Sequence, residues 1–222
     1  MFDIKKLKND KTCKLKLAGE INSSEYFTRR KDSPKYISVK LVVGDKHDHR
    51  CKFCSFQGEG LEIVNLDQDY RNNDINNLVP ACEFCTKPQL LDFYSMDYEG
   101  DDRMIYLPDI RQDQLSLLYR ALIYSISKGG DNAYNAQMIY AQLKDQASFL
   151  DKKMGSELSH PAQFSHYLKS KKADPEFINK IRWLPSLDLK HYPSLAPSLV
   201  EEYDMLIESD KKKKIKAARA AS

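Results

Sequence analysis

The sequence predicts an α+β protein in which a small metal-binding core precedes a mainly α-helical region. Two cysteine pairs with the spacing C-x2-C, at 51–54 and 82–85, mark the core and are separated by 27 residues. Beyond residue 107, apolar residues recur at helical spacing, with prolines and a glycine pair at the expected helix boundaries. With 222 residues and 41% hydrophobic composition, the chain has enough apolar surface for one sizeable domain.

The N-terminal part carries short signals for regular structure. Residues 14–17 alternate lysine and leucine, which predicts an edge strand. Cys13 is interpreted as a small residue in this strand-like segment. Residues 36–43 are apolar enough for a short strand or a helix, and we expect Gly44 to end that element.

The 27 residues between the cysteine pairs predict a strand that ends near Leu66 and a polar turn after it. Asp74 can cap a helical turn over 75–79 that leads to the second cysteine pair. Asp67 and Asp69 suggest a calcium loop, but the glycine expected after a third acidic ligand is missing, so this interpretation is rejected.

The helical region begins with a capping pattern, in which Asp109 is the predicted N-cap and Gln112 follows three residues later. Gly129 and Gly130 are expected to end this helix, and a second helix is predicted over 132–152. The predicted buried stripes are Leu115, Leu118, Leu122, Ile123 and Ile126 in the first helix, and Ile139, Leu143, Ala147 and Leu150 in the second.

Prolines divide the remainder of the chain. Pro161 and Pro175 are expected in the first turns of two shorter helices, where the backbone N–H that proline lacks would have no partner within the helix. A link with three further prolines then leads to a final helix that carries Leu199, Tyr203 and Leu206.

The cysteine pairs predict a structural metal site made of Cys51, Cys54, Cys82 and Cys85. Four thiolates give one zinc ion a closed tetrahedral shell, with no position left for water or substrate. In a reducing compartment, paired C-x2-C motifs are typical of metal binding rather than of disulfides. Because an unfolded chain has no preformed site, zinc binding would also stabilise the fold.

The histidines are expected to lie outside this site. His47 and His49 precede the first cysteine pair, but four cysteines already satisfy the metal, so both are interpreted as exposed loop residues. His160, His166 and His191 are scattered through the helical half and suggest no cluster.

Charge is unevenly distributed along the chain. Residues 211–222 carry six basic side chains and no acidic one, and the remaining 29 basic and 32 acidic residues leave a net charge of −3. This basic tail is interpreted as a solvated helix end, with an acidic partner, RNA or a membrane surface as alternatives. No stretch reaches the roughly 20 apolar residues of a membrane span, and no signal peptide is visible, so neither membrane insertion nor export is expected.

The segment LDQDYRNNDINNLVPACEFC, at 66–85, resembles the core of the HNH endonucleases, a ββα-metal unit often flanked by two C-x2-C knuckles. Asn77 corresponds to their central asparagine, whose side chain ties the loop to the backbone. The catalytic positions differ: Val64 and Asn65 replace two consecutive histidines, and Thr86 replaces a last metal ligand. The resemblance therefore implies an HNH-like fold without catalysis, because valine cannot hold a metal and a neutral amide cannot take a proton from water.

Several segments are also similar to the IcmJ (DotN) family of the Dot/Icm type IVB secretion systems. They are CKFCSFQ at 51–57, IVNLDQDY at 63–70, NNLV at 76–79, CEFC at 82–85, IYLPD at 105–109 and IRWLPS at 181–186. The resemblance covers most of the chain from about Tyr36 to Ser186, and the basic tail departs from the family pattern.

This resemblance implies a zinc-bearing, nuclease-dead HNH-like subunit of a cytoplasmic coupling complex at the inner membrane. The implied partner is the C-terminal extension of the DotL-type coupling ATPase; IcmS–IcmW-type adaptors and effector proteins are indirect partners, and no nucleic acid is expected. The expected parts are an N-terminal extension (1–35), the HNH-like zinc-binding core (36–98), a helical region packed on it (99–210) and the basic tail (211–222).

Two alternatives keep a link to nucleic acids. One is an HNH-like nucleic-acid-binding protein that uses the basic tail and the loop near residues 46–50, although the negative charge of the rest of the chain disfavours it. The other is a metal-dependent nuclease with unusual ligands, such as His47, His49, Asp67 or Asp69.

Overall fold

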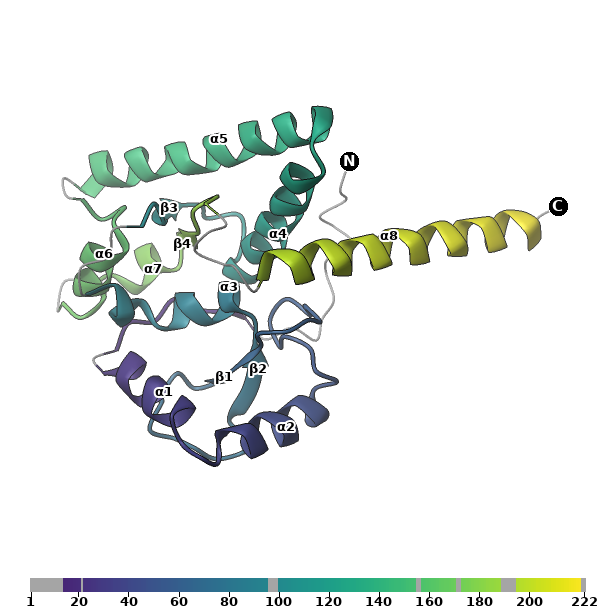
Figure 1. Ribbon diagram of the computed structural model, residues 1–222. Helices are drawn as coiled ribbons and strands as arrows, with labels where there is room; N and C mark the ends of the chain where they lie inside the picture. The colour runs from purple at the N-terminus through teal and green to yellow at the C-terminus, as the bar shows by residue number, and fades with distance from the viewer. Residues whose placement is uncertain are drawn as a thin grey trace.

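The computed structural model describes residues 14–20, 22–95, 100–154, 157–170, 173–188 and 195–220. Figure 1 shows α1, α2, β1 and β2 at one end of the molecule, α5 at the other, and α3 between them. The elements are α1 (Ser23–Lys31), α2 (Tyr36–Lys46), β1 (Glu62–Asn65), β2 (Leu78–Ala81), α3 (Glu83–Thr86), η2 (Lys87–Gln89), η3 (Leu91–Ser95), β3 (Arg103–Tyr106), α4 (Gln112–Lys128), α5 (Gly130–Met154), α6 (Pro161–Leu168), α7 (Pro175–Ile178), β4 (Ile181–Leu184) and α8 (Leu195–Ala220).

The hairpin of β1 and β2 buries both of its faces. The two strands are antiparallel, with Ile63 opposite Pro80. On one face, α2 covers the hairpin, where Tyr36 and Val43 pack with Ile63 and Leu78. The opposite face joins the main core, which also includes side chains of α4, α5, β3, β4 and the first turns of α8. The mixed α and β composition and the small antiparallel sheets agree with the predicted α+β class.

A second antiparallel sheet, which the sequence did not predict, joins β3 to β4, with Met104 opposite Trp183. All four residues of β4 are buried, so the strand shows none of the polar–apolar alternation by which a half-exposed strand is recognised. The side chain of Gln112 hydrogen-bonds to the backbone of β4: it accepts a hydrogen bond from the Trp183 amide at 2.8 Å and donates to the Trp183 carbonyl at 3.0 Å.

The edge strand predicted over 14–17 is wrong. This segment lies beside η2 and η3 instead, where the Ala18 amide donates to the Pro88 carbonyl and the Leu91 amide donates to the Ala18 carbonyl, both at 2.9 Å. The alternating pattern reflects burial of Leu15 between exposed lysines, because the neighbouring backbone is helical and offers no strand ladder.

The segment 36–43 forms a helix, α2, and Gly44 does not end it, since the helix continues to Lys46. The backbone of Gly44 lies close to the ring of His49: a Cβ atom at position 44 would meet Nδ1 of His49 at 2.7 Å, so the exposed His49 side chain would have to shift. His49 itself lies in a tight turn with a positive φ of 50° and folds back over the end of α2.

The predicted helical turn over 75–79 is correct only for its start. Asp74 accepts a hydrogen bond from the Asn76 amide at 2.8 Å, and a single turn follows. Leu78 and Val79 then belong to β2, because pairing with β1 satisfies their backbone and buries both side chains.

The first long helix begins at Gln112 rather than after Asp109. Arg111 is its N-cap, and the Arg111 amide donates to the side chain of Gln114 at 2.9 Å, so the capped first turn lies two residues later than predicted. The predicted stripe is confirmed: Leu115, Leu122 and Ile123 are buried, and the other two members are half-buried against the core.

In α5, Ala147 and Leu150 are buried as predicted, but Ile139 is 41% exposed and Tyr140 is buried in its place. In α8, Leu199 and Tyr203 are buried, whereas Leu206 is 56% exposed because the helix extends beyond the body at that point, as Figure 1 shows. The prolines that open α6 and α7 are confirmed, with His160 and Asp174 as N-caps. None of the helices that the structure describes has the length and apolar character needed to cross a membrane.

Candidate metal centre

The two cysteine pairs occupy tight backbone turns on either side of the hairpin. In the first, the Cys51 amide donates to the Phe56 carbonyl at 2.8 Å, and Ser55 takes a positive φ of 60° to close the turn. In the second, Cys82 precedes α3, and the Cys85 amide donates to the Cys82 carbonyl at 2.9 Å. Lys52 donates its amide to the Pro80 carbonyl at 2.8 Å, which fixes the first turn against β2.

The four predicted ligands, Cys51, Cys54, Cys82 and Cys85, come together in the structure. Their Sγ atoms all lie within 4.8 Å of one another, and those of Cys54 and Cys82 are 3.5 Å apart. All four residues are buried, and none is part of a disulfide. Sulfurs bound to zinc at ~2.3 Å in a tetrahedron are separated by about 3.8 Å, so the donor set fits one such ion. The cluster can therefore bind a metal ion.

The neighbours of the cysteine thiols shift their pKa values in different directions. Hydrogen bonds from Cys51, Cys82 and Cys85 lower the pKa of the Cys54 thiol well below its ordinary value. Hydrogen bonds with Cys51 and Cys54 raise the pKa of the Cys82 thiol, and burial raises the pKa of the Cys85 thiol. The Cys54 thiolate is thus stabilised by its neighbours, and a bound cation would favour ionisation of Cys82 and Cys85.

Arg120 connects this cluster to the last helix. Its Nη1 atom donates to Sγ of Cys54 at 3.4 Å, and its Nη2 atom pairs with the carboxylate of Glu202 on α8. The guanidinium also lies over the ring of Phe56, 4.4 Å from the ring centre, and Arg120 is only 2% exposed. Burial alone would lower the pKa of Arg120, but the negative charges around it, those of Cys54, Cys82 and Glu202, raise it.

The histidines do not join this site. Within the described residues, the four cysteines are the group of histidine, cysteine or carboxylate side chains whose ligand atoms lie close enough to hold a metal ion. His49 is exposed, and its Nε2 atom lies 2.8 Å from the carboxylate of Asp45. His47 is half-buried at the end of α2; His191 and Cys13 lie outside the described residues.

The three residues that the HNH resemblance places at catalytic positions have buried side chains. Val64 and Asn65 are both 0% exposed, and Thr86 is 5% exposed. Asn65 donates to the carbonyls of Asp69 at 2.9 Å and Asn72 at 2.5 Å, and its side-chain oxygen accepts from Arg30 at 2.7 Å. These bonds use both amide hydrogens of Asn65 and one lone pair of its side-chain oxygen.

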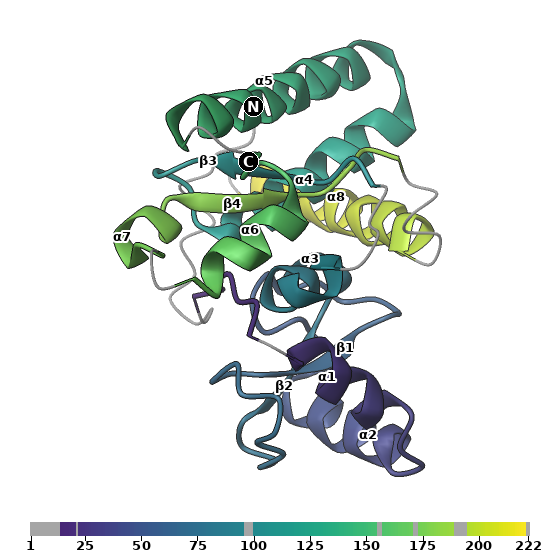
Figure 2. The ribbon, with the colours of Figure 1, turned by 90° about the vertical axis from the view of Figure 1, so that its left-hand side faces the viewer.

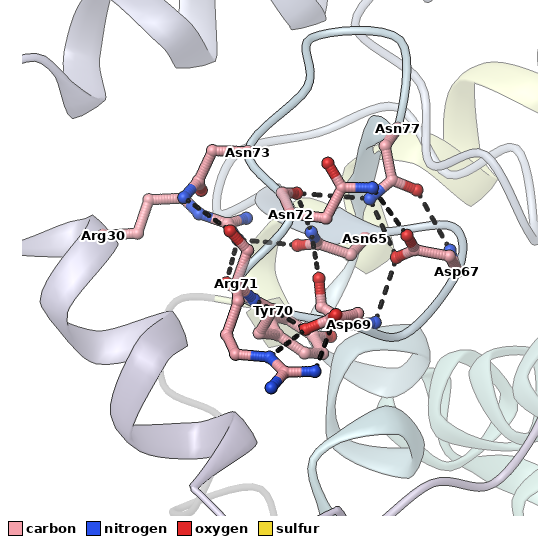
Figure 3. A network of polar contacts seen from close by, with 9 residues as sticks. All are labelled: Arg30, Asn65, Asp67, Asp69, Tyr70, Arg71, Asn72, Asn73 and Asn77. Atoms are coloured by element: carbon pink, nitrogen blue, oxygen red, sulfur yellow. Dashed lines mark hydrogen bonds and ion pairs between the residues drawn. The ribbon is translucent and has the colours of Figure 1, made fainter.

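The loop between β1 and β2 is ordered by the same polar network, whose nine residues Figure 3 shows. Asn77 accepts from the Asp67 amide at 3.1 Å and donates to the Asn72 carbonyl at 3.2 Å, as expected for an asparagine that ties this loop to the backbone. The carboxylate of Asp67 accepts from Asn77 at 2.8 Å and from Asn72 at 2.7 Å, and Asp69 pairs with Arg71.

Arg30, Arg120 and Glu202 were not found from the sequence. Arg120 gave one usable signal, because it interrupts an otherwise apolar run of residues 115–126, and a charge at such a position needs a buried partner. Arg30 and Glu202 lie in charged segments where nothing distinguishes them from solvated residues.

No protein-family model matches the chain. Among characterised proteins, the chain is similar to the type 4 apparatus protein DotN of Legionella pneumophila, with 31% identity over 184 residues. The match covers 80% of this chain and 86% of the relative.

Proposed function

The chain belongs to the DotN (IcmJ) family of the Dot/Icm type IV secretion systems, and from this premise we propose that it is a structural subunit of the coupling complex of such a system. In this role it binds the C-terminal extension of the DotL-type coupling ATPase and supports effector translocation. IcmS–IcmW-type adaptors and effectors are reached through that partner. The protein is cytoplasmic and is held at the inner-membrane complex by the ATPase. The observation that carries the proposal is an identity with DotN that spans most of both chains.

The proposed metal is one structural zinc ion, held by the four cysteines. The chemistry of the donor set supports zinc, because four buried thiolates offer a closed shell that binds a soft divalent ion and leaves no open coordination position. When bound, the ion supplies the positive charge that the thiolates need, and it cross-links the turns on both sides of the hairpin.

The protein is proposed to be a nuclease-dead HNH-like fold. The order β1, β2, α3, with cysteine pairs before the hairpin and at α3, supports the HNH-like assignment. The absence of catalysis is supported by Asn65, whose amide is buried and occupied by three hydrogen bonds, and by the buried Val64, which cannot bind a metal. Plasmid nicking with Mg²⁺ that is lost in Asp67→Ala would contradict this proposal.

The deciding experiment uses the purified full-length protein with its native metal and the C-terminal extension of the coupling ATPase from the same organism. We expect one zinc per chain and a stoichiometric complex with submicromolar affinity by calorimetry. A folded, zinc-loaded sample that does not bind the extension would overturn the proposal. Binding to DNA or RNA that falls steeply with salt would instead support the nucleic-acid alternative, for which the exposed Lys211 and Lys212 on α8 are the relevant observation.

A further inference from the structure

Helix α2 carries apolar side chains both on the side that the fold covers and on sides that it leaves exposed. Tyr36 and Val43 face the hairpin and are buried. On the sides away from the hairpin, Ile37 is 73% exposed, Leu41 57% and Val42 56%. Exposed aliphatic side chains grouped on one helix are typical of a surface that contacts a partner.

Five exposed residues of α2 form a continuous surface, which we call the α2 face: Ile37, Ser38, Leu41, Val42 and Asp45. Ile37 and Leu41 are one helical turn apart and lie next to each other. Ser38 and Asp45 follow around the helix, between Leu41 and Val42. Figures 1 and 2 both show α2 at the end of the molecule opposite α5, with no element on its outer side.

The charge around the α2 face is positive. Between residues 35 and 52 the chain carries five basic residues and two acidic ones. Lys35, Lys46 and Arg50 are exposed, as are both acidic residues, Asp45 and Asp48, so the exposed charges are positive on balance. Asp45 lies 2.8 Å from Nε2 of His49. A partner of complementary charge therefore carries acidic residues beside its own apolar ones.

We propose that the α2 face binds an acidic amphipathic helix of a partner polypeptide, with aliphatic side chains at three- and four-residue spacing and carboxylates on either side. This inference rests on the proposed function, under which the helix belongs to the C-terminal extension of the coupling ATPase. Packing of helix against helix would cover Ile37 and Leu41, and Lys35 and Lys46 would lie beside the carboxylates.

Other occupants fit the α2 face less well. A second copy would bring the same positive charge against itself. A nucleic acid gains nothing from aliphatic side chains, since bases stack on aromatic rings. An anionic membrane would have to accept Asp45 between Leu41 and Val42, and the side chain of Asp45 is 74% exposed and charged, whereas a protein partner can hydrogen-bond to it.

The test measures binding of the ATPase extension to four full-length proteins: wild type, Leu41→Asp, the double variant Lys35→Glu with Lys46→Glu, and the control Tyr134→Asp. Tyr134 on α5 is 65% exposed, which makes it a matched exposed apolar position at the far end of the molecule. We expect Leu41→Asp to weaken binding at least tenfold, the double variant to weaken it several-fold at low salt, and the control to bind like wild type.

Hydrogen exchange gives a second readout that needs no variant, because the amides of 36–46 should become more protected in the wild-type complex. Wild-type affinity in Leu41→Asp, with no added protection of 36–46, would overturn the assignment of the α2 face while leaving the proposed function intact. Failure of the wild-type protein to bind the extension would overturn both. Leu41-dependent binding to vesicles of phosphatidylserine and phosphatidylcholine, without an effect on the extension, would assign the α2 face to a membrane instead.

Discussion

Arg120 donates a hydrogen bond to the Cys54 sulfur at 3.4 Å, from a position 2% exposed to solvent. The same guanidinium pairs with Glu202, and Glu202 also accepts the Gln57 amide at 3.1 Å. The cysteine cluster, α4 and α8 are thus joined by one buried cation. With the proposed zinc ion bound, four thiolates would carry excess negative charge, and Arg120 would offset part of it. Its ion pair with Glu202 also holds the first turns of α8 in place.

Loss of Arg120 is expected to destabilise the protein strongly. Arg120→Met leaves Glu202, 9% exposed, without its cation, and breaking one side of a buried ion pair costs ~3–5 kcal/mol. Urea unfolding measures this cost, and the exposed ion pair of Lys128 with Asp204 provides the control, since Lys128→Met should change stability little. An Arg120→Met protein as stable as the control would show that the buried pair contributes nothing.

Replacement of a cysteine ligand is expected to release the metal and loosen the fold. In Cys82→Ser the closed shell loses one of its four donors, and the free energy of zinc binding no longer stabilises the turns on both sides of the hairpin. Metal content by mass spectrometry should fall below one zinc per chain, and the thermal transition should broaden and shift downward. Cys13→Ser, which removes a thiol that is not among the four predicted ligands, is the control and should behave like wild type.

The loop between β1 and β2 is expected to depend on Asn65. Its side chain makes hydrogen bonds to Asp69, Asn72 and Arg30 in a fully buried position, so Asn65→Ala should cost ~2–3 kcal/mol because buried donors and acceptors lose their partners. Asn73→Ala, at an exposed position in the same loop, should change little. Equal unfolding midpoints for the two variants in urea would contradict this expectation.

Stability is expected to fall at alkaline pH. Burial raises the pKa of Tyr203 from 10.0 to about 12 despite the nearby Arg120, and burial likewise raises the pKa values of Tyr36, Tyr70, Tyr119 and Tyr140. At a pH between 10.0, the pKa of an unfolded tyrosine, and the higher pKa in the folded protein, the folded state keeps tyrosine protons that the unfolded state has lost. The stabilisation is therefore complete below pH 10 and is lost as the pH rises toward 12.

This pH dependence can be measured as the free energy of unfolding at several values above and below pH 10, together with tyrosine ionisation by ultraviolet absorbance. The tyrosines should ionise late and together with unfolding. Early ionisation of most tyrosines in a protein that stays folded would contradict the burial that the structure describes.

Features that depend on a few neighbouring residues, such as the metal-ligand turns and the helix starts, could be predicted from the sequence. The C-x2-C spacing predicted which four cysteines come together, because each pair must close a short turn. Helical spacing predicted the buried stripe of α4, and prolines predicted the starts of α6 and α7, because these signals act within one or two turns of backbone. The role of Asn77 was also local, since it bonds to its own loop.

Only the tertiary structure decided which distant segments meet. The pairing of β3 with β4 places Met104 opposite Trp183. Because all four residues of β4 are buried, its sequence lacks the alternation of polar and apolar residues from which a strand can be predicted. The partners of Arg120 are Cys54 and Glu202, which lie far from it in the sequence. A charged residue is predicted to be solvent-exposed from sequence alone, and only the packing of distant segments buries it. The same holds for α2, where the sequence showed an apolar segment but only packing against the hairpin decided which sides remain exposed.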